Sequence, residues 1–129
     1  MDAAYPRAAE GLALAPGQHD VRGAAKASDL YAVRVKRAAS VVIVWTDYMK
    51  HRAELRGFDL SRIEHIVRFG QERYRDTATG RAVAVGRHGT SLVVVPFEQD
   101  GESITPVTVH ATSRQQVEFR VKSGRFSRE

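Results

Sequence analysis

The sequence predicts a single small α+β domain, in which one strand and two helices precede a four-stranded antiparallel meander and a C-terminal helix. Its 129 residues, 43% of them hydrophobic, are enough to bury one core but few for two. Helical and strand-like patterns also occupy separate stretches of the chain and do not alternate. That segregation is typical of α+β proteins.

The first strand and the first helix adjoin each other. The β-branched run from Val41 to Trp45 predicts a buried strand. Thr46 or Asp47 can then cap a helix that continues to about Arg56, and Gly57 is suited to end it. The order strand, cap and helix is therefore predicted from local chemistry alone.

The second helix is predicted by an apolar stripe and a capping box. Ser61 and Glu64 have the capping-box spacing, and Gly70 marks the end. The stripe consists of Leu60, Ile63, Ile66 and Val67. We expect this helix to place its stripe against the sheet.

The meander is predicted by four alternating segments at about residues 71–76, 81–87, 91–98 and 104–111, joined by short turns. Pro106 cannot donate a ladder hydrogen bond, so the last strand begins late or has that position at an edge. Both helices should cover one side of the sheet. The predicted core includes Val44, Ile63, Ile66, Val67, Val83, Val85, Val93, Val95 and Val109.

A capped helix beginning with Arg114 is predicted to follow the last strand. Thr112 and Ser113 can cap it, and Gln116 stands at the capping-box spacing from Ser113. Strand alternation places His110 on the face away from the helical core, at the start of this helix. An imidazole, a guanidinium and free helical N–H groups at one point suit a phosphate.

The chain is predicted to divide into an N-terminal arm, residues 1–37, and the domain, residues 38–129. The arm is rich in alanine, glycine and isolated charges and shows no sustained helical or strand period, so we expect it to pack poorly or to be disordered.

Composition narrows the class of function. A formal net charge of +5 favours polyanionic partners. The absence of cysteine excludes disulfides, a thiol nucleophile and cysteine-bound zinc, and the five histidines show no short metal-ligand spacing, so we expect no metal and no cofactor. No apolar run is long enough to span a bilayer. We expect a soluble, cytoplasmic protein with no membrane partner.

Cationic and polar residues gather at strand ends and turns, and we expect them to meet on one concave, basic face of the sheet. Each taken singly is more often a solvated surface charge, so only convergence would indicate a site. The candidates are Tyr74, Arg75, Arg81, Arg87, His88, His110 and Arg114.

The segment from about Val42 to Phe126, about two thirds of the chain, carries a family resemblance. Its landmarks are Val44-Trp45, Arg56-Gly57, the hairpin that ends Ala84-Val85-Gly86-Arg87, and Val109-His110-Ala111 before a helix that holds Glu118. In this pattern the chain resembles the small toxins of the RelE/ParE superfamily, most nearly the BrnT-like group. Where BrnT-like proteins usually read Ser-Ala-Arg, this chain reads His110-Ala111-Thr112.

The resemblance implies a RelE/ParE-like fold and a metal-independent ribonuclease toxin of a type II toxin-antitoxin system, with a cognate antitoxin protein as partner. RNA cleavage by its own 2′-hydroxyl needs a base, an acid and cations at the phosphate, but no metal. His110 would act as base or acid, with Arg114 and Arg81 stabilising charge. Tyr74 would stack on a base or donate a proton. Arg75, Arg87 and His88 would bind the RNA substrate.

Two alternatives remain open. The first is a non-catalytic binder or inhibitor that uses the same basic face to hold a nucleic acid or an acidic protein. The second is an inactive member of the family, which the change from Ser-Ala-Arg favours.

Overall fold

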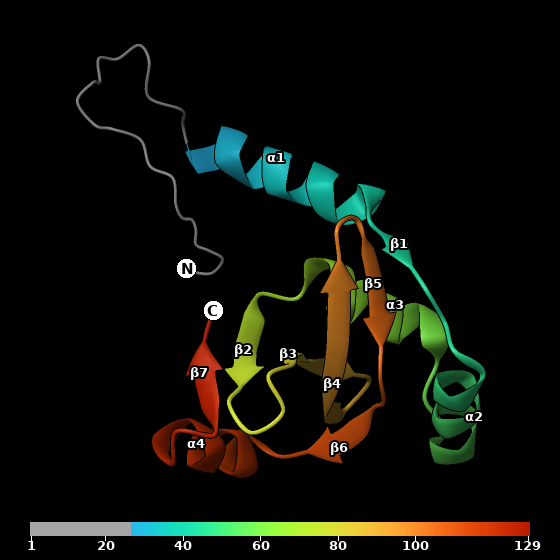
Figure 1. Ribbon diagram of the computed structural model, residues 1–129, viewed down its shortest axis with the longest axis vertical. Coiled ribbons are helices and arrows are strands. Elements are labelled where there is room, and N and C mark those ends of the chain that lie inside the picture. The colour runs from blue at the N-terminus through green and yellow to red at the C-terminus, as the bar shows by residue number, and fades with distance from the viewer. Residues whose placement is uncertain (1–26) are drawn as a thin grey trace.

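The computed structural model describes residues 27–129, which form a small α+β domain with helices on both faces of a mixed sheet (Figure 1). The helices are α1 (Ala27–Ser40), α2 (Asp47–Arg56), α3 (Leu60–Phe69) and α4 (Arg114–Lys122). The strands are β1 (Val42–Ile43), β2 (Glu72–Asp76), β3 (Ala82–His88), β4 (Ser91–Asp100), β5 (Ser103–Pro106), β6 (His110–Thr112) and β7 (Phe126–Arg128). The predicted α+β class is confirmed, whereas the finer RelE/ParE-like topology stays a prediction.

The sheet has the strand order β1-β5-β4-β3-β2-β7, and β6 also pairs with β4. The predicted antiparallel meander is present as β2, β3, β4 and β5 in succession. β1 joins this meander by parallel pairing with β5, so the sheet is mixed. The chain must cross the sheet between β1 and β2, and it does so through α2 and α3.

The strand that was predicted at residues 104–111 is two strands, β5 and β6, which pair with opposite ends of β4. Pro106 and Pro96 explain the break, because neither has an N–H to donate to the ladder between these segments. The N–H of Val107 still donates to the carbonyl of Pro96 at 2.8 Å, after which the chain leaves the sheet until His110. The break places β6 at the end of the sheet between α2 and α4 (Figure 1).

The core has two parts, one on each face of the sheet. On one face α2 and α3 cover the strands, and the buried side chains are Met49, Ala53, Ile63, Ile66, Val67, Ala84, Val93, Val95, Phe97, Ile104 and Val109. On the other face α4 covers the strands, and the buried side chains are Tyr74, Val83, Val85, Leu92, Val94, Val117 and Phe126. Strand alternation explains the division, since neighbouring residues of β3 and β4 point to opposite faces.

Eight of the nine predicted core residues are buried, and Val44 is the exception, with 43% of its side chain exposed. The predicted strand 41–45 is only two residues long, and Val44 follows it at the edge of the sheet. Its N–H still donates to the carbonyl of Ile104 at 2.8 Å, but no strand lies on its outer side among residues 27–129. The β-branched run predicted that Val44 is buried, but its position at the edge of the sheet leaves it partly exposed.

The caps of α2 are those expected. Thr46 accepts a hydrogen bond from the N–H of Met49, and Gly57 ends the helix at a positive φ of 75°. At α3 the predicted capping box is wrong: Asp59 is the cap and accepts from the N–H and hydroxyl of Ser61. Glu64 instead pairs with Arg68 at 2.8 Å.

α3 packs closely on β3 because one strand residue lacks a side chain. A Cβ added at Gly86 would lie 2.9 Å from both γ carbons of Ile66. Real Cβ atoms do not approach carbon so closely, and a β-branched neighbour cannot turn away easily. Gly86 therefore sets the distance between α3 and the sheet.

α1 was not expected, since residues 27–37 fall in the predicted arm. The alanine-rich segment forms a helix, which intrinsic helix propensity allows. Arg68 holds its C-terminal end by donating hydrogen bonds to the carbonyls of Ala38, Ala39 and Val41. Residues 1–26 of the predicted arm lie outside the described residues, and the domain boundary at residue 38 stays a prediction.

The C-terminal segment adds a strand that the sequence did not predict. α4 begins as expected, with Ser113 accepting from the N–H of Gln116 at 3.1 Å. After α4 the chain forms β7, which pairs with β2 and carries Phe126 into the core. Among residues 27–129, no helix is long and apolar enough to cross a membrane.

Candidate functional site

The seven residues predicted to share a site lie on both faces of the sheet. On β2, Tyr74 pairs with Val83 on the α4 face, whereas Arg75 pairs with Ala82, which packs on the face of α2 and α3. His88 is also on the second of these faces, where its ring meets Phe58 edge-on with centroids 5.1 Å apart. The single concave face that we expected is therefore not formed.

Carboxylates neutralise three of the predicted cations. Arg75 pairs with Glu129 at 2.5 Å and Arg81 with Glu98 at 3.1 Å. Arg114 pairs with Glu72 at 2.5 Å. A guanidinium already bound to a carboxylate has less attraction left for a phosphate, so these three positions are poor anchors for RNA.

Tyr74 belongs to the core, with 2% of its surface exposed. Its ring stacks on Phe126 with centroids 5.3 Å apart, and its hydroxyl donates to Glu72 at 2.6 Å. Burial and that hydrogen bond raise the pKa of Tyr74 to about 12. This tyrosine has no free ring face or available proton for RNA.

His88 and Arg87 serve the turn between β3 and β4 and the start of α3. Nε2 of His88 accepts the N–H of Asp59 at 2.8 Å, which fixes the cap of α3. Arg87 is exposed and donates to the carbonyl of Thr90 at 3.3 Å. None of these contacts involves His110.

His110 is half-buried on β6, where it pairs with Val94 of β4. Nη1 of Arg56 donates to Nδ1 of His110 at 3.0 Å and to the carbonyl of Val109 at 3.4 Å. Arginine has donors only, so Nδ1 must be the acceptor in this contact. The neutral ring therefore carries its hydrogen on Nε2.

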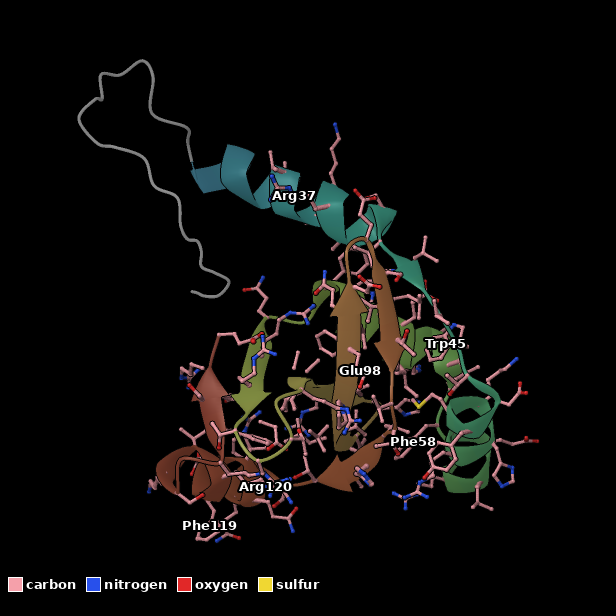
Figure 2. The ribbon with its side chains drawn as sticks, in the orientation of Figure 1. Arg37, Trp45, Phe58, Glu98, Phe119 and Arg120 are labelled. Carbon is pink, nitrogen blue, oxygen red and sulfur yellow. The ribbon has the colours of Figure 1, made fainter. Side chains whose placement is uncertain are left out.

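Three guanidinium groups are close enough to influence the charge of this histidine. Burial lowers the pKa of His110, and the positive charges of Arg56, Arg52 and Arg120 lower it further, in that order. Arg52 and Arg56 come from α2 and Arg120 from α4, on either side of β6 (Figures 1 and 2). We call Arg52, Arg56, His110 and Arg120 the His110 cluster. At neutral pH its histidine is uncharged while its arginines carry three positive charges.

Among the side chains that the structure describes, no carboxylate forms an ion pair with the arginines of the His110 cluster. Arg52 lies 5.5 Å from the ring centroid of Tyr48, and Arg120 lies 5.5 Å from that of Phe126. Nε of Arg52 is buried and has no hydrogen-bond partner in the described part of the chain. Like charges held together without a counter-charge indicate a place for an anion.

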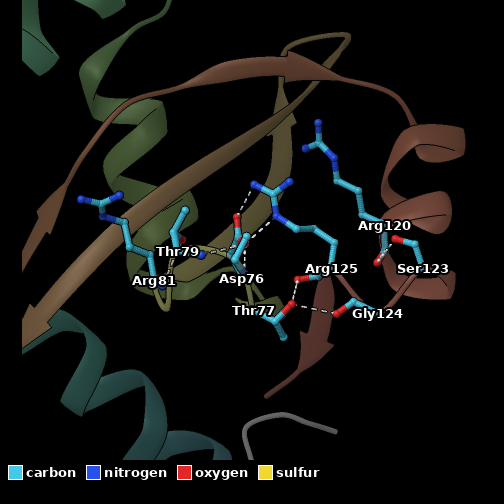
Figure 3. A network of polar contacts seen from close by, with 9 residues as sticks. Asp76, Thr77, Thr79, Arg81, Arg120, Ser123, Gly124 and Arg125 are labelled. Carbon is cyan, nitrogen blue, oxygen red and sulfur yellow. Dashed lines mark hydrogen bonds and ion pairs between the residues drawn. The ribbon is translucent and has the colours of Figure 1, made fainter.

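A second charged network, centred on Asp76, is structural (Figure 3). Arg125 donates to both carboxylate oxygens of Asp76, at 2.6 and 3.0 Å, and the N–H groups of Ala78 and Thr79 donate to Oδ1. The network ties the turn after β2 to the start of β7. Arg120 also lies in this view, where its backbone carbonyl accepts a hydrogen bond from the hydroxyl of Ser123 at 3.2 Å.

Acid should weaken the fold through Asp76, which is 7% exposed. The hydrogen bonds from Arg125 hold the pKa of Asp76 below its ordinary value. The stability it adds is therefore present above the unfolded pKa, about 4, and is lost as pH falls through the lower folded pKa. We expect Asp76→Asn to lower the free energy of unfolding by about 1–2 kcal/mol at neutral pH.

The measurement for Asp76 is chemical unfolding over a range of pH. The difference between the wild type and Asp76→Asn should shrink toward the most acidic samples, because both chains then lack the charge. Asp100→Asn, at an exposed aspartate of β4, is the matched control. A difference that stayed constant at all pH values would contradict the role of the ionised carboxylate.

Sequence reasoning missed Arg52, Arg56 and Arg120. Arg52 and Arg56 stand four residues apart on α2, which places them on one side of the helix. This four-residue spacing is the sequence signal from which the pairing of Arg52 and Arg56 could have been predicted. The contribution of Arg120 was not visible, because it depends on how α4 approaches β6.

Comparison with models of protein families, with curated proteins and with solved structures finds nothing that matches this chain. In residues 27–129 no group of three or more histidine, cysteine, aspartate or glutamate side chains is placed to hold a metal ion. A function must therefore be argued from the His110 cluster itself.

Proposed function

We propose that this protein binds RNA through the His110 cluster and holds it without cutting it. The observation that supports the proposal is the convergence of three arginines that no carboxylate neutralises on one uncharged histidine. A phosphate between them would relieve their mutual repulsion, and the planar guanidinium matches its oxygens. The Nε2 hydrogen of His110 supplies a neutral donor to the same anion.

RNA fits the site better than duplex DNA. A reader of duplex DNA commonly inserts one helix or a strand pair into the major groove. Here the cations come from two helices on opposite faces of the sheet, with the short strand β6 between them (Figure 1). An arrangement of this kind suits contacts to a backbone, and the net charge of +5 attracts polyanions from a distance.

The geometry of His110 is less suited to catalysis. A general base must accept a proton, but Nδ1 already accepts from Arg56 and Nε2 carries the hydrogen. A general acid must be protonated, which burial and the three arginines oppose by lowering the pKa of His110. These contacts favour the non-catalytic binder over the ribonuclease toxin that the family resemblance implies. An antitoxin partner is expected only if the protein is such a toxin.

Binding and cleavage can be measured on the same samples of labelled RNA in excess EDTA. We expect a bound complex, intact RNA, and a loss of about fivefold in affinity for His110→Ala, the usual effect of one neutral hydrogen bond. Products that end in 2′,3′-cyclic phosphate, formed about 10² to 10⁴ times more slowly by His110→Ala, would instead establish the ribonuclease. Absence of any complex with the wild type would remove the proposal altogether.

A further inference from the structure

Two exposed aromatic rings lie on α2 and α4, the helices that supply the arginines of the His110 cluster. Tyr48 is 56% exposed and Phe119 is 71% exposed. Tyr48 lies one turn before Arg52 on α2, and Phe119 immediately precedes Arg120 on α4. The other exposed large hydrophobic side chains of the described residues are aliphatic, namely Val33, Val42, Val44 and Leu55.

The Tyr48 ring is next to a cation of the cluster, and Phe119 is the neighbour of Arg120 along α4. The guanidinium of Arg52 lies 5.5 Å from the centroid of the Tyr48 ring, within the range of a cation–π contact. Figure 2 shows Phe119 on α4 beside Arg120, at the end of the molecule where β6 lies. Neither ring is needed by the core, since the core rings Tyr74, Phe97 and Phe126 are buried.

We infer that the ligand of the His110 cluster is a single-stranded RNA whose backbone crosses the cluster and whose unpaired bases stack on Phe119 and Tyr48. The inference rests on the proposed function and adds that the bound RNA is single-stranded. Surfaces that hold single strands combine cations along the backbone with aromatic rings for the bases. A duplex keeps its base faces inside its own stack and has none to offer these rings.

The cluster and the two rings have separable tasks. The cluster binds phosphate and is insensitive to the presence of bases, whereas the rings bind bases and are insensitive to phosphate. A polyanion without bases should therefore engage the arginines alone. Inorganic polyphosphate is such a probe, and it isolates the contribution of charge from that of stacking.

The test compares the affinities of three probes for the full chain: a short single-stranded RNA, the same strand in a duplex, and inorganic polyphosphate. Phe119→Leu removes the ring but keeps an apolar side chain, and Phe119→Trp keeps a ring. We expect Phe119→Leu to weaken single-strand binding roughly 5- to 150-fold, the usual effect of losing one stacked base, and Phe119→Trp to retain it. Neither variant should alter polyphosphate binding, and the exposed Phe119 can be replaced without loss of the fold.

The outcomes separate this inference from the proposed function. Equal affinity for single strand and duplex, or an unchanged single-strand affinity in Phe119→Leu, would overturn the stacking while leaving phosphate binding by the arginines in place. Failure of the wild type to bind either polyphosphate or RNA would overturn both. Polyglutamate bound as tightly as RNA would also overturn both and would indicate an acidic protein as the partner.

Discussion

Replacing Arg52, Arg56 and Arg120 together with alanine is expected to lower the affinity for single-stranded RNA roughly 10²- to 10³-fold, because each loss removes a charge-assisted contact to phosphate. Log affinity falls with log salt by about 0.7 per phosphate contact on a single strand. The slope measured for the triple variant should therefore be smaller by about 2. Both quantities come from titrations of labelled RNA at several salt concentrations.

The matched control removes three other positive charges. Lys36, Arg37 and Arg62 are exposed on α1 and α3. Figure 2 shows Arg37 at the opposite end of the molecule from Arg120. Their combined replacement with alanine lowers the net charge equally, so it should reduce only the long-range attraction. An equal loss of affinity in the two triple variants would mean that the protein attracts RNA by net charge and has no localised site.

The single variant Arg81→Ala distinguishes binding at the His110 cluster from binding at the basic face that the sequence predicted. Arg81 belongs to that predicted face, and Glu98 neutralises its charge at 3.1 Å. We expect Arg81→Ala to cost less affinity than any single replacement within the His110 cluster. Surface ion pairs add little stability, so the fold should tolerate this change.

The sequence predicted the parts of the fold that depend on local chemistry. Thr46 and Gly57 mark the ends of α2 because a hydroxyl cap and a left-handed glycine act on their immediate neighbours. The turns that join β2, β3, β4 and β5 were predicted for the same reason. At α3 two polar residues on either side of Leu60, Asp59 and Ser61, were both suited to cap, and the spacing to Glu64 favoured the wrong one.

Features that depend on distant contacts were not predicted. The division of the last strand into β5 and β6 depends on where Pro96 and Pro106 fall in the ladder, in which Pro106 is the partner of Phe97, and no local pattern reveals this register. β7 is three residues long and exists because β2 has a free edge. α1 is held at its C-terminal end by Arg68 of α3, a contact between residues far apart in the sequence.

The candidate site could be predicted only in part, because charge neutralisation is a property of the folded chain. Arg75, Arg81 and Arg114 looked available in the sequence, but each meets a carboxylate from elsewhere in the fold. His110 does lie among cations, but they are not the ones that the sequence suggested. They are Arg52 and Arg56 of α2 and Arg120 of α4.

The sequence and the structure assign different roles to Tyr74, and each role calls for a different experiment. In the sequence it was a candidate to stack on a base or to donate a proton. In the structure it is buried against Phe126, and burial together with the hydrogen bond to Glu72 raises the pKa of Tyr74 to about 12. Burial raises the pKa of Glu72 too, but hydrogen bonds from Arg114 and Tyr74 outweigh that effect and hold it below its ordinary value.

Tyr74→Ala is expected to lower the free energy of unfolding by about 3–5 kcal/mol, the usual cost of removing a buried aromatic side chain. The ring fills the space between β2, β7 and α4, where Val83, Val117 and Phe126 also pack. Small shifts of these neighbours cannot close a cavity of that size. Denaturant unfolding monitored by circular dichroism measures the loss, provided that the transition stays cooperative.

Tyr74→Phe is the control that separates packing from the hydroxyl group. It keeps the ring and removes one donor to Glu72, which Arg114 still pairs at 2.5 Å, so we expect a cost of about 0.5–1.5 kcal/mol. Its RNA affinity should equal that of the wild type, because the hydroxyl faces the protein. A Tyr74→Phe variant that folds normally but binds RNA several-fold more weakly would place Tyr74 in the interface, and would require the α4 face of the sheet to open when RNA binds.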